Sequence, residues 1–190
     1  MSGATLAPLK PLQLQTGRLR FTEFEGGDAE TLYALFSDPQ AMRYWSREPM
    51  QDPAEAVQLI DEIATLRERD ELYQWALRLE DGTLIGTATL HAFSLVNRRC
   101  EIGYMLARAH WGRGLMHEAL DALISHVFEF TGIERIGADV DPRNVRSIAL
   151  LKRLGFREEG LRRATYRLYG EVQDSKLMGL LAKDRVPPGA

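Results

Sequence analysis

Short segments in which every second residue is apolar recur along this chain. This alternation is typical of β-strands that bury one face and expose the other. Two further extended segments near the C-terminus flank Gly170. Seven strands are predicted in all, at residues 18–24, 73–79, 84–93, 101–106, 135–140, 156–169 and 171–181.

Four other segments carry apolar residues three and four positions apart, as amphipathic helices do. Asp28 is expected to cap the first helix, and Asp52-Pro53 supplies a cap and a first-turn proline for the second. Gly155 follows the last helix at the position of a C-cap glycine. The helices are predicted at about residues 29–37, 53–70, 115–128 and 144–154.

The order of these elements, β, α, α, β, β, β, α, β, α, β, β, indicates the fold class. Three consecutive strands form an antiparallel meander and argue against a doubly wound fold. A helix between the fourth and fifth strands requires that this pair be parallel. We therefore expect an α/β (α+β) fold with a mixed, mostly antiparallel sheet. One domain is expected over residues 13–183, between flexible tails at residues 1–12 and 184–190.

The composition is that of an ordinary globular protein, with 190 residues, 45% of them apolar and 27% charged. No apolar run approaches the ~20 residues of a membrane-spanning helix, and the N-terminal residues do not have the pattern of a signal peptide. The single cysteine, Cys100, excludes an internal disulfide and is more typical of a structural residue than of a catalytic thiol. Together these features predict a cytoplasmic protein without a membrane partner.

Charge is distributed unevenly, although the net charge is only −3. Residues 142–168 hold eight basic residues against two acidic ones, and residues 48–71 hold eight acidic residues against two basic ones. Solvated helix faces explain much of each run. The alternative is a molecule that binds an anion on one side and meets a cation on the other.

A glycine motif, Trp111-Gly112-Arg113-Gly114, separates the strand at 101–106 from the next helix. Glycines allow a close approach to a ligand, and the first N–H groups of a helix are unpaired and attract anions. Strand, Gly-x-Gly and helix in this order therefore predict a phosphate cradle, with Arg108 and Arg113 adding positive charge. A tight turn would explain the glycines equally well, and neither a Walker loop nor a dinucleotide fingerprint is present.

A second motif begins the last helix with Asn144-Val145-Arg146-Ser147 and continues to Leu154-Gly155-Phe156. Helix capping alone would explain Asn144 and Ser147. Taken together, the two motifs make the chain similar to the GCN5-related N-acetyltransferases (GNAT family), and within them to the RimJ/RimL-type ribosomal-protein N-terminal acetyltransferases. The resemblance covers about residues 17–182. Trp111 and Met116 depart from the family motif, which has Gln or Arg and Gly or Ala at these positions.

The resemblance implies a binding site for acetyl-CoA and no metal. The two parallel strands would splay apart between helices on both faces of the sheet, and acetyl-CoA would lie in the gap. The residues that would hold it are Met105, Leu106 and Ala107 along the pantetheine arm, Trp111, Gly112, Arg113, Gly114, Leu115 and Met116 at the pyrophosphate, and Asn144 and Ser147.

The resemblance also implies direct attack of an amine on the thioester. Glu101 is the predicted base, acting through water, and Ser147 the predicted donor to the leaving thiol. A surface carboxylate and a locally bonded helix residue are the plainer interpretations of these two side chains. Many family members use a tyrosine three or four residues later, but Leu150 and Leu151 stand there.

The expected partner is an amine acceptor. By resemblance the acidic helix at 52–71 lies near the acceptor cleft, with Tyr44, Trp45 and Glu101, a lining that suits a cationic amine. A protein or peptide N-terminal α-amine ranks first, and a polyamine, an aminoglycoside or another small amine is the alternative. The pattern does not distinguish a monomer from a homodimer.

Three functions other than acetyl transfer have some support in the sequence. The helix residues from His117 to Asp121 lack the second histidine of a zinc-protease helix, which argues against a metal. A nucleic-acid-binding module built on residues 142–168 is the non-enzymatic alternative, although the net charge argues against a nucleic-acid partner. A catalytically inactive acetyl-CoA sensor is another alternative.

Overall fold

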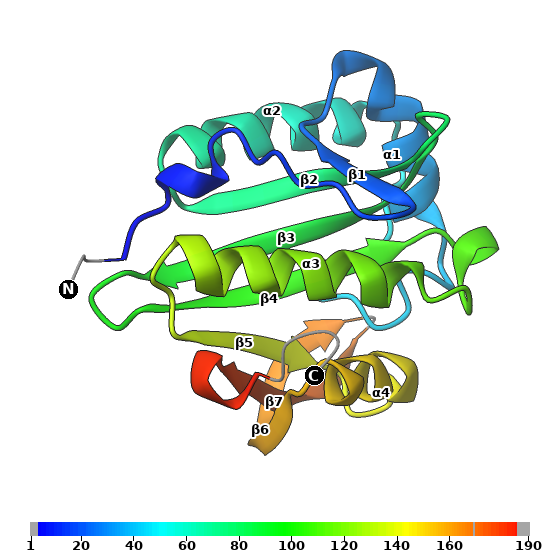
Figure 1. Cartoon of the computed structure of the whole chain (residues 1–190). Helices are drawn as coiled ribbons and strands as arrows, with labels where there is room; N and C mark the ends of the chain where they lie inside the picture. Colours follow the sequence, from blue (N-terminus) through cyan, green and yellow to red (C-terminus); the bar gives the residue numbers. More distant parts are fainter. Residues whose placement is uncertain (1–3, 169, 186–190) are drawn as a thin grey trace.

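One seven-stranded sheet forms the centre of the computed structural model, which describes residues 4–168 and 170–185 (Figure 1). The strand order is β1-β2-β3-β4-β5-β7-β6, and every neighbouring pair is antiparallel except β4 and β5. This confirms the predicted mixed sheet with one central parallel pair. The strands are β1 (Leu19–Thr22), β2 (Leu72–Leu79), β3 (Leu84–Ser94), β4 (Arg99–Leu106), β5 (Arg135–Val140), β6 (Arg157–Leu168) and β7 (Glu171–Leu181).

Helices cover both faces of the sheet (Figure 1). Helices α3 and α4 pack on one face over the larger apolar core, and α1 and α2 enclose a smaller core on the other. The α-helices are α1 (Ala29–Ser37), α2 (Ala54–Glu68), α3 (Leu115–Phe130) and α4 (Val145–Arg153). Short 3-10 turns are η1 (Ala7–Leu9), η2 (Gly26–Asp28), η3 (Arg108–His110) and η4 (Ala182–Asp184). None of the helices in the described ranges is long and apolar enough to cross a membrane.

The first two helices start near the predicted positions, but their caps differ from those expected. Helix α2 begins one residue after the predicted start, at Ala54 with Pro53 as its N-cap, and the Asp52 carboxylate accepts the Ala54 N–H at 2.8 Å. Asp28 makes no cap bond to α1. Its carboxylate accepts instead from the Glu25 N–H and from the guanidinium of Arg78, because the 3-10 turn η2 leads directly into α1 and Arg78 lies within reach on β2.

The N-terminal segment differs from the flexible tail that the sequence suggested. Leu6, Leu9 and Leu12 are buried in the larger core. The Thr5 N–H donates to the Thr131 carbonyl at 2.8 Å, and a ring nitrogen of His126 lies 3.1 Å from the Pro8 carbonyl. Burial here needs no regular period, because these leucines project from irregular backbone. Residues 1–3 lie outside the described part.

The C-terminal end differs in a similar way. Arg185 donates to the Asp121 carboxylate at 2.7 Å and to the Ser125 hydroxyl at 2.6 Å, so the described chain remains attached to α3 up to that residue. The expected tail therefore does not begin at residue 184. Its remaining residues, 186–190, and Tyr169 at the end of a predicted strand lie outside the described part.

Candidate active site

The parallel strands β4 and β5 separate soon after they meet. They pair only through Arg99 with Arg135, Cys100 with Ile136, and Glu101 with Gly137. Strand β4 then continues to Leu106 and β5 to Val140 without pairing to each other. The ladder between β4 and β5 therefore ends at Glu101 and Gly137, and the region beyond it, between the two unpaired strand ends, is called the wedge below, with its narrow end at this pair.

Backbone groups of β4 point alternately to its two neighbours. The Ala107 N–H donates to the Ile85 carbonyl at 2.8 Å, on the β3 side, and the Arg98 carbonyl accepts from Glu134 and Arg135, on the β5 side. Even-numbered residues of β4 thus present their backbone toward β5 and the wedge. Of the three residues expected along the pantetheine arm, only Leu106 does so.

Met105 and Ala107 turn their backbone groups toward β3, and Tyr104, which the sequence analysis did not select, turns its groups toward the wedge. The alternation was visible in the sequence, but its phase depends on which residues of β4 bond to β3. The Leu106 carbonyl already accepts from the Trp111 indole N–H at 2.7 Å.

The glycine loop brings a run of free N–H groups to the wide end of the wedge. Gly112 and Gly114 have φ of 75° and 74°, in the left-handed region that favours glycine, and Gly114 is the N-cap of α3. The first N–H of α3 with a backbone acceptor is that of Glu118, which donates to the Gly114 carbonyl at 3.0 Å. Within the described part of the chain, the N–H groups of residues 112–117 meet no acceptor. This arrangement suits an anion.

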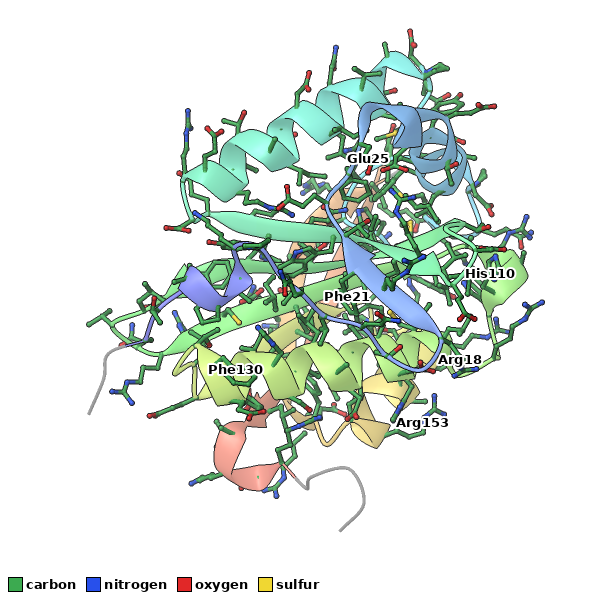
Figure 2. All side chains as sticks on the ribbon, turned by 45° about the horizontal axis from the view of Figure 1, so that its top comes forward. Arg18, Phe21, Glu25, His110, Phe130 and Arg153 are labelled. Atoms are coloured by element: carbon green, nitrogen blue, oxygen red, sulfur yellow. The ribbon has the colours of Figure 1, made fainter. Side chains whose placement is uncertain are left out.

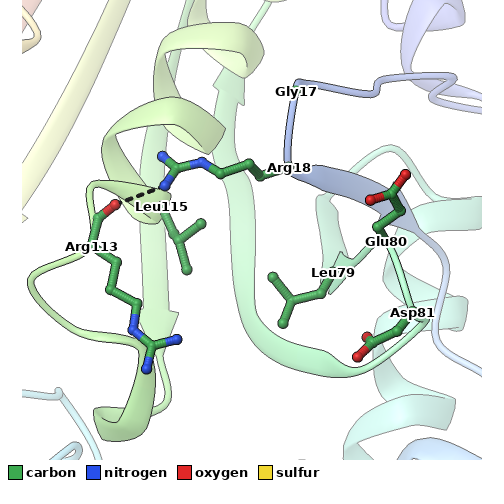
Figure 3. Close-up of a pocket in the computed structure, with 7 residues that line it drawn as sticks. All are labelled: Gly17, Arg18, Leu79, Glu80, Asp81, Arg113 and Leu115. Atoms are coloured by element: carbon green, nitrogen blue, oxygen red, sulfur yellow. Dashed lines mark hydrogen bonds between the residues drawn. The ribbon is translucent and has the colours of Figure 1, made fainter.

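Arg18 of the β1 end fixes this loop from the side opposite the wedge. Its guanidinium donates to the Arg113 carbonyl at 3.0 Å (Figure 3). It also donates to the Glu118 carboxylate at 2.6 Å. Figure 2 shows Arg18 near the first turn of α3 and Phe130 at the other end of that helix. Burial raises the pKa of Glu118, but hydrogen bonds from Thr16 and Arg18 outweigh burial and lower it below its usual value. The sequence alone did not indicate this long-range brace.

An open pocket of about 610 Å³ lies beside the brace (Figure 3). Arg113 lines it, and among the described residues no carboxylate pairs with the Arg113 guanidinium. Arg108 differs from the expectation, because its guanidinium is paired with Asp38 at 2.5 Å and bonded to Gln40 at 2.7 Å. Arg113 is therefore unpaired, although Glu80 and Asp81 line the same pocket, and Arg108 is neutralised.

Helix α4 closes the wedge on the larger-core side. The Asn144 side-chain oxygen accepts the Ser147 N–H at 3.1 Å, so this oxygen serves as the cap of α4. The Ser147 hydroxyl bonds to a residue outside α4: it lies 2.7 Å from the Tyr104 hydroxyl on β4. Burial raises the pKa of Tyr104 to about 12, against a smaller opposing effect of the hydrogen bond with Ser147. The contact spans 43 residues, which is why no local pattern predicted it.

Glu101 lies at the narrow end of the wedge, on the sheet face that carries α1 and α2. It stands opposite Gly137, and a side chain there would lie 3.4 Å from the Glu101 Cγ, so the glycine leaves room. Asp139 follows two residues later on the same face of β5. Its carboxylate accepts from Arg162 at 3.2 Å and from Tyr166 at 3.4 Å, and also from Ser175. Two carboxylates therefore lie along this face of the wedge.

Cys100, the residue before Glu101, is buried on the opposite face. Burial, followed by the charge of Glu101, raises the pKa of the Cys100 thiol to about 12. A buried thiol that stays protonated at neutral pH is not a nucleophile, which agrees with the structural role favoured by the sequence.

Tyr44, Trp45 and helix α2, which the sequence placed near the acceptor cleft, differ from one another in what they contact. The ring of Tyr44 lies 6.0 Å from the guanidinium of Arg143, which joins it to the loop between β5 and α4. Trp45 packs edge-on against Phe36, 5.9 Å away, as part of the smaller core. The acidic helix α2 packs on β2 and α1, and Ala56 near its start shares the smaller core with Met105 of β4.

The structure also bears on metal binding. No cluster of three or more His, Cys, Asp or Glu side chains that could hold a metal ion occurs in the part of the chain that the structure describes.

Comparison with known proteins identifies similar sequences over most of the chain. A model of the acetyltransferase (GNAT) domain matches residues 18–157. An uncharacterised N-acetyltransferase of Bacillus subtilis is 32% identical over 169 residues, which cover 88% of this chain and 96% of that protein. The [ribosomal protein uS5]-alanine N-acetyltransferase of Escherichia coli is 39% identical over 112 residues, which cover 57% of this chain and 56% of that enzyme.

A spermidine N(1)-acetyltransferase of Vibrio cholerae is 26% identical over 165 residues, covering 86% of this chain and 93% of that enzyme. A solved structure of a spermidine N-acetyltransferase from Vibrio cholerae, in complex with CoA and spermine, superposes with a TM-score of 0.79. It is 22% identical and covers 89% of this chain and 98% of the solved one. At that identity the likeness concerns the fold.

Proposed function

The chain belongs to the acetyltransferase (GNAT) family and is an N-acetyltransferase, and we propose that it transfers the acetyl group of acetyl-CoA to the N-terminal α-amine of a protein or peptide. The observation that carries the cofactor assignment is the wedge between β4 and β5 with free N–H groups at its wide end. An extended pantetheine arm fits an opening between two strands, and a pyrophosphate fits a helix N-terminus. The nucleic-acid-binding alternative loses its support with the family assignment, and release of CoA thiol with an amine distinguishes the enzyme from an inactive acetyl-CoA sensor.

The glycine loop is the proposed pyrophosphate site. The N–H groups from Gly112 to Met116 would donate to its oxygens, and the unpaired guanidinium of Arg113 would add charge. Trp111 would hold the loop against β4 through its bond to the Leu106 carbonyl. Arg146 of α4, stacked on Trp111 at 5.4 Å, would supply further positive charge.

The pantetheine arm would pair with the wedge-facing backbone of β4. Leu106 remains the predicted partner. Tyr104 would be a second partner, because it also turns its backbone groups toward the wedge. Met105 and Ala107 would act indirectly, by fixing β4 on β3. Asn144 would hold the start of α4 beside the arm through its cap to Ser147, and its amide N–H₂ group would be free to donate.

The reaction needs a base for the amine and a proton for the leaving sulfur. The amine nitrogen attacks the thioester carbonyl, the C–N bond forms and the C–S bond breaks. The proton that nitrogen loses passes through water to Glu101, and sulfur takes a proton from the Ser147 hydroxyl. The two groups flank the wedge from opposite faces of the sheet, which keeps the two proton transfers apart.

The acceptor assignment is supported by the balanced charge around Arg143 at the mouth of the wedge. The Arg143 guanidinium lies 6.0 Å from the centre of the Tyr44 ring, and the Asp141 carboxylate pairs with it at 2.6 Å. A side of the mouth without net charge suits an acceptor with one amine and a peptide backbone. The relative that acts on the alanine of ribosomal protein uS5 agrees with that choice.

A small cationic amine is the second candidate. Glu101 and Asp139 on one face of the wedge favour it, and one relative acts on spermidine. Release of CoA thiol from acetyl-CoA distinguishes the candidates when it is measured with N-terminal peptides, polyamines and aminoglycosides in parallel. We expect the highest kcat/KM with a peptide that begins with a small residue. Turnover of spermidine at a higher kcat/KM than any peptide would reject the proposed acceptor.

A further inference from the structure

The contact between Tyr104 and Ser147 joins the two sides of the wedge. Tyr104 projects from β4 toward the face that carries α3 and α4, and Ser147 projects from the first turn of α4. Their hydroxyl oxygens are 2.7 Å apart. No other side-chain hydrogen bond in the described ranges links β4 to α4.

Tyr104 occupies a position that packing alone would give to an apolar residue. Its neighbours on the same side of β4, Cys100 and Ile102, are both buried and apolar. A tyrosine hydroxyl placed there needs a polar partner. The partner is the one hydroxyl that the proposed reaction uses, and Leu150 and Leu151 further along α4 are buried and have none.

The bonding around Ser147 determines where its own proton can go. Asn144 takes the Ser147 N–H, so the hydroxyl is not needed to cap the helix. Burial keeps Tyr104 protonated at neutral pH, since its pKa is raised to about 12. Either hydroxyl can donate in this contact. When the protonated phenol donates, Ser147 Oγ accepts and keeps its own proton for a third group.

We propose that Tyr104 is a positioning residue for thiolate protonation: its hydroxyl donates to Ser147 Oγ and turns the Ser147 proton into the wedge, toward the leaving sulfur. The inference rests on the proposed function, because it requires that a thioester react at this place. As sulfur takes the Ser147 proton, the Tyr104 phenol, the stronger acid of the two hydroxyls, passes its proton to Ser147 Oγ and then recovers one from solvent. The proton that the attacking nitrogen loses passes through water to Glu101 and from there to solvent, so the protons balance.

The test is Tyr104→Phe, which keeps the ring and removes the hydroxyl. We expect kcat to fall about tenfold while KM for acetyl-CoA changes less than about twofold, because the lost bond acts on the leaving group and not on binding. Tyr33→Phe is the matched control, since the Tyr33 hydroxyl makes one long, exposed bond of 3.4 Å to the Gln51 carbonyl. It should leave both constants unchanged.

A second variant, Ser147→Ala, makes the result independent of any folding defect. In the proposed arrangement Tyr104→Phe has no further effect on kcat once Ser147 is alanine, so the two losses are not additive. A purely structural contact would lower the melting temperature of both single variants and leave kcat intact.

Provided that the wild-type enzyme is active, either of two outcomes overturns the inference. The first is an unchanged kcat for folded Tyr104→Phe, and the second is a double variant in which the kcat losses of Tyr104→Phe and Ser147→Ala add in full. Failure of the wild-type chain to release CoA with any amine would reject the proposed function instead, so the two failures are distinguishable.

Discussion

Gly114 controls both the backbone and the charge at the start of α3. Its φ of 74° is strained for any residue with a side chain, and a Cβ there would face only the Arg18 guanidinium, 3.6 Å away. A side chain at position 114 therefore has room, and a substitution acts through backbone strain and through any charge that it adds. The two effects can be separated by replacing Gly114 with a small neutral residue and with an acidic one.

Gly114→Glu should weaken acetyl-CoA binding by about tenfold, because its side chain points toward Arg18 and adds a negative charge beside the proposed phosphate site. Gly114→Ala introduces the same backbone strain without charge, and we expect it to cost about 1 kcal/mol of stability with a much smaller loss of affinity. Calorimetric titration with acetyl-CoA measures both. Equal affinities for the two variants would show that the loop does not hold phosphates.

Glu101→Gln should lower kcat by about 100-fold, the usual size of a lost general base. The loss should be greatest at low pH, where the free amine is scarce and assisted deprotonation matters most. The measurement is a pH–rate profile against that of Glu158→Gln, an exposed carboxylate paired with Lys176 at 2.8 Å. A Glu101→Gln profile that overlays the wild-type profile would remove Glu101 from the chemistry.

At the scale of elements, the first turn of α3 is the part that must stay in place. Glu118 accepts from Thr16 at 2.6 Å and from the Arg18 backbone at 2.9 Å, and so ties the helix to the start of β1. Its negative charge also suits the positive end of the helix dipole. The brace holds the glycine loop from behind while leaving its N–H groups free.

Glu118→Gln should reduce the free energy of unfolding at pH 7 by about 1 kcal/mol, a value that allows for the partial exposure of the pair. The folded-state pKa of Glu118 lies below its ordinary value of 4.5. Its contribution is therefore present above that value and is lost as the pH falls through the folded-state pKa.

Urea unfolding at pH 7 and near pH 3 checks this difference, which should shrink at the lower pH. Glu129→Gln, an exposed position at the other end of α3, is the control and should change little. A difference that stays constant with pH would mean that the carboxylate charge is not responsible.

At the scale of the whole molecule, the N-terminal segment acts as part of the core. It crosses from the end of α3, where Thr5 bonds to Thr131, to the corner between α2 and β2, where Lys10 pairs with Asp70 at 2.6 Å. Leu9 between these points is 1% exposed. The segment thus joins the helix of the candidate site to the far edge of the sheet.

Leu9→Ala should lower the free energy of unfolding by about 3 kcal/mol, as large-to-small changes in a packed core do. Urea denaturation measures the loss. Leu161→Ala is the control, because Leu161 is 52% exposed, and should cost less than about 0.5 kcal/mol. Similar small losses of unfolding free energy for both variants would show that the N-terminal segment is a loose tail and not part of the core.

The order of strands and helices was determined by the sequence itself. Alternation marked the strands, helical spacing marked α3, and Asn144 marked the start of α4, because each of these patterns acts within a few residues of the chain. The glycine loop was predictable for the same reason: Gly-x-Gly next to a helix N-terminus is a local arrangement. The parallel pair followed from the order of the elements.

Only the tertiary structure decided how far β4 and β5 stay paired, which backbone groups of β4 face the wedge, and that Tyr104 meets Ser147. It also decided that Arg108 is neutralised and that Leu9 is buried. Each of these depends on strand register or on contacts between residues far apart in the chain. A local pattern records what a residue prefers, whereas packing selects its partner from the whole molecule.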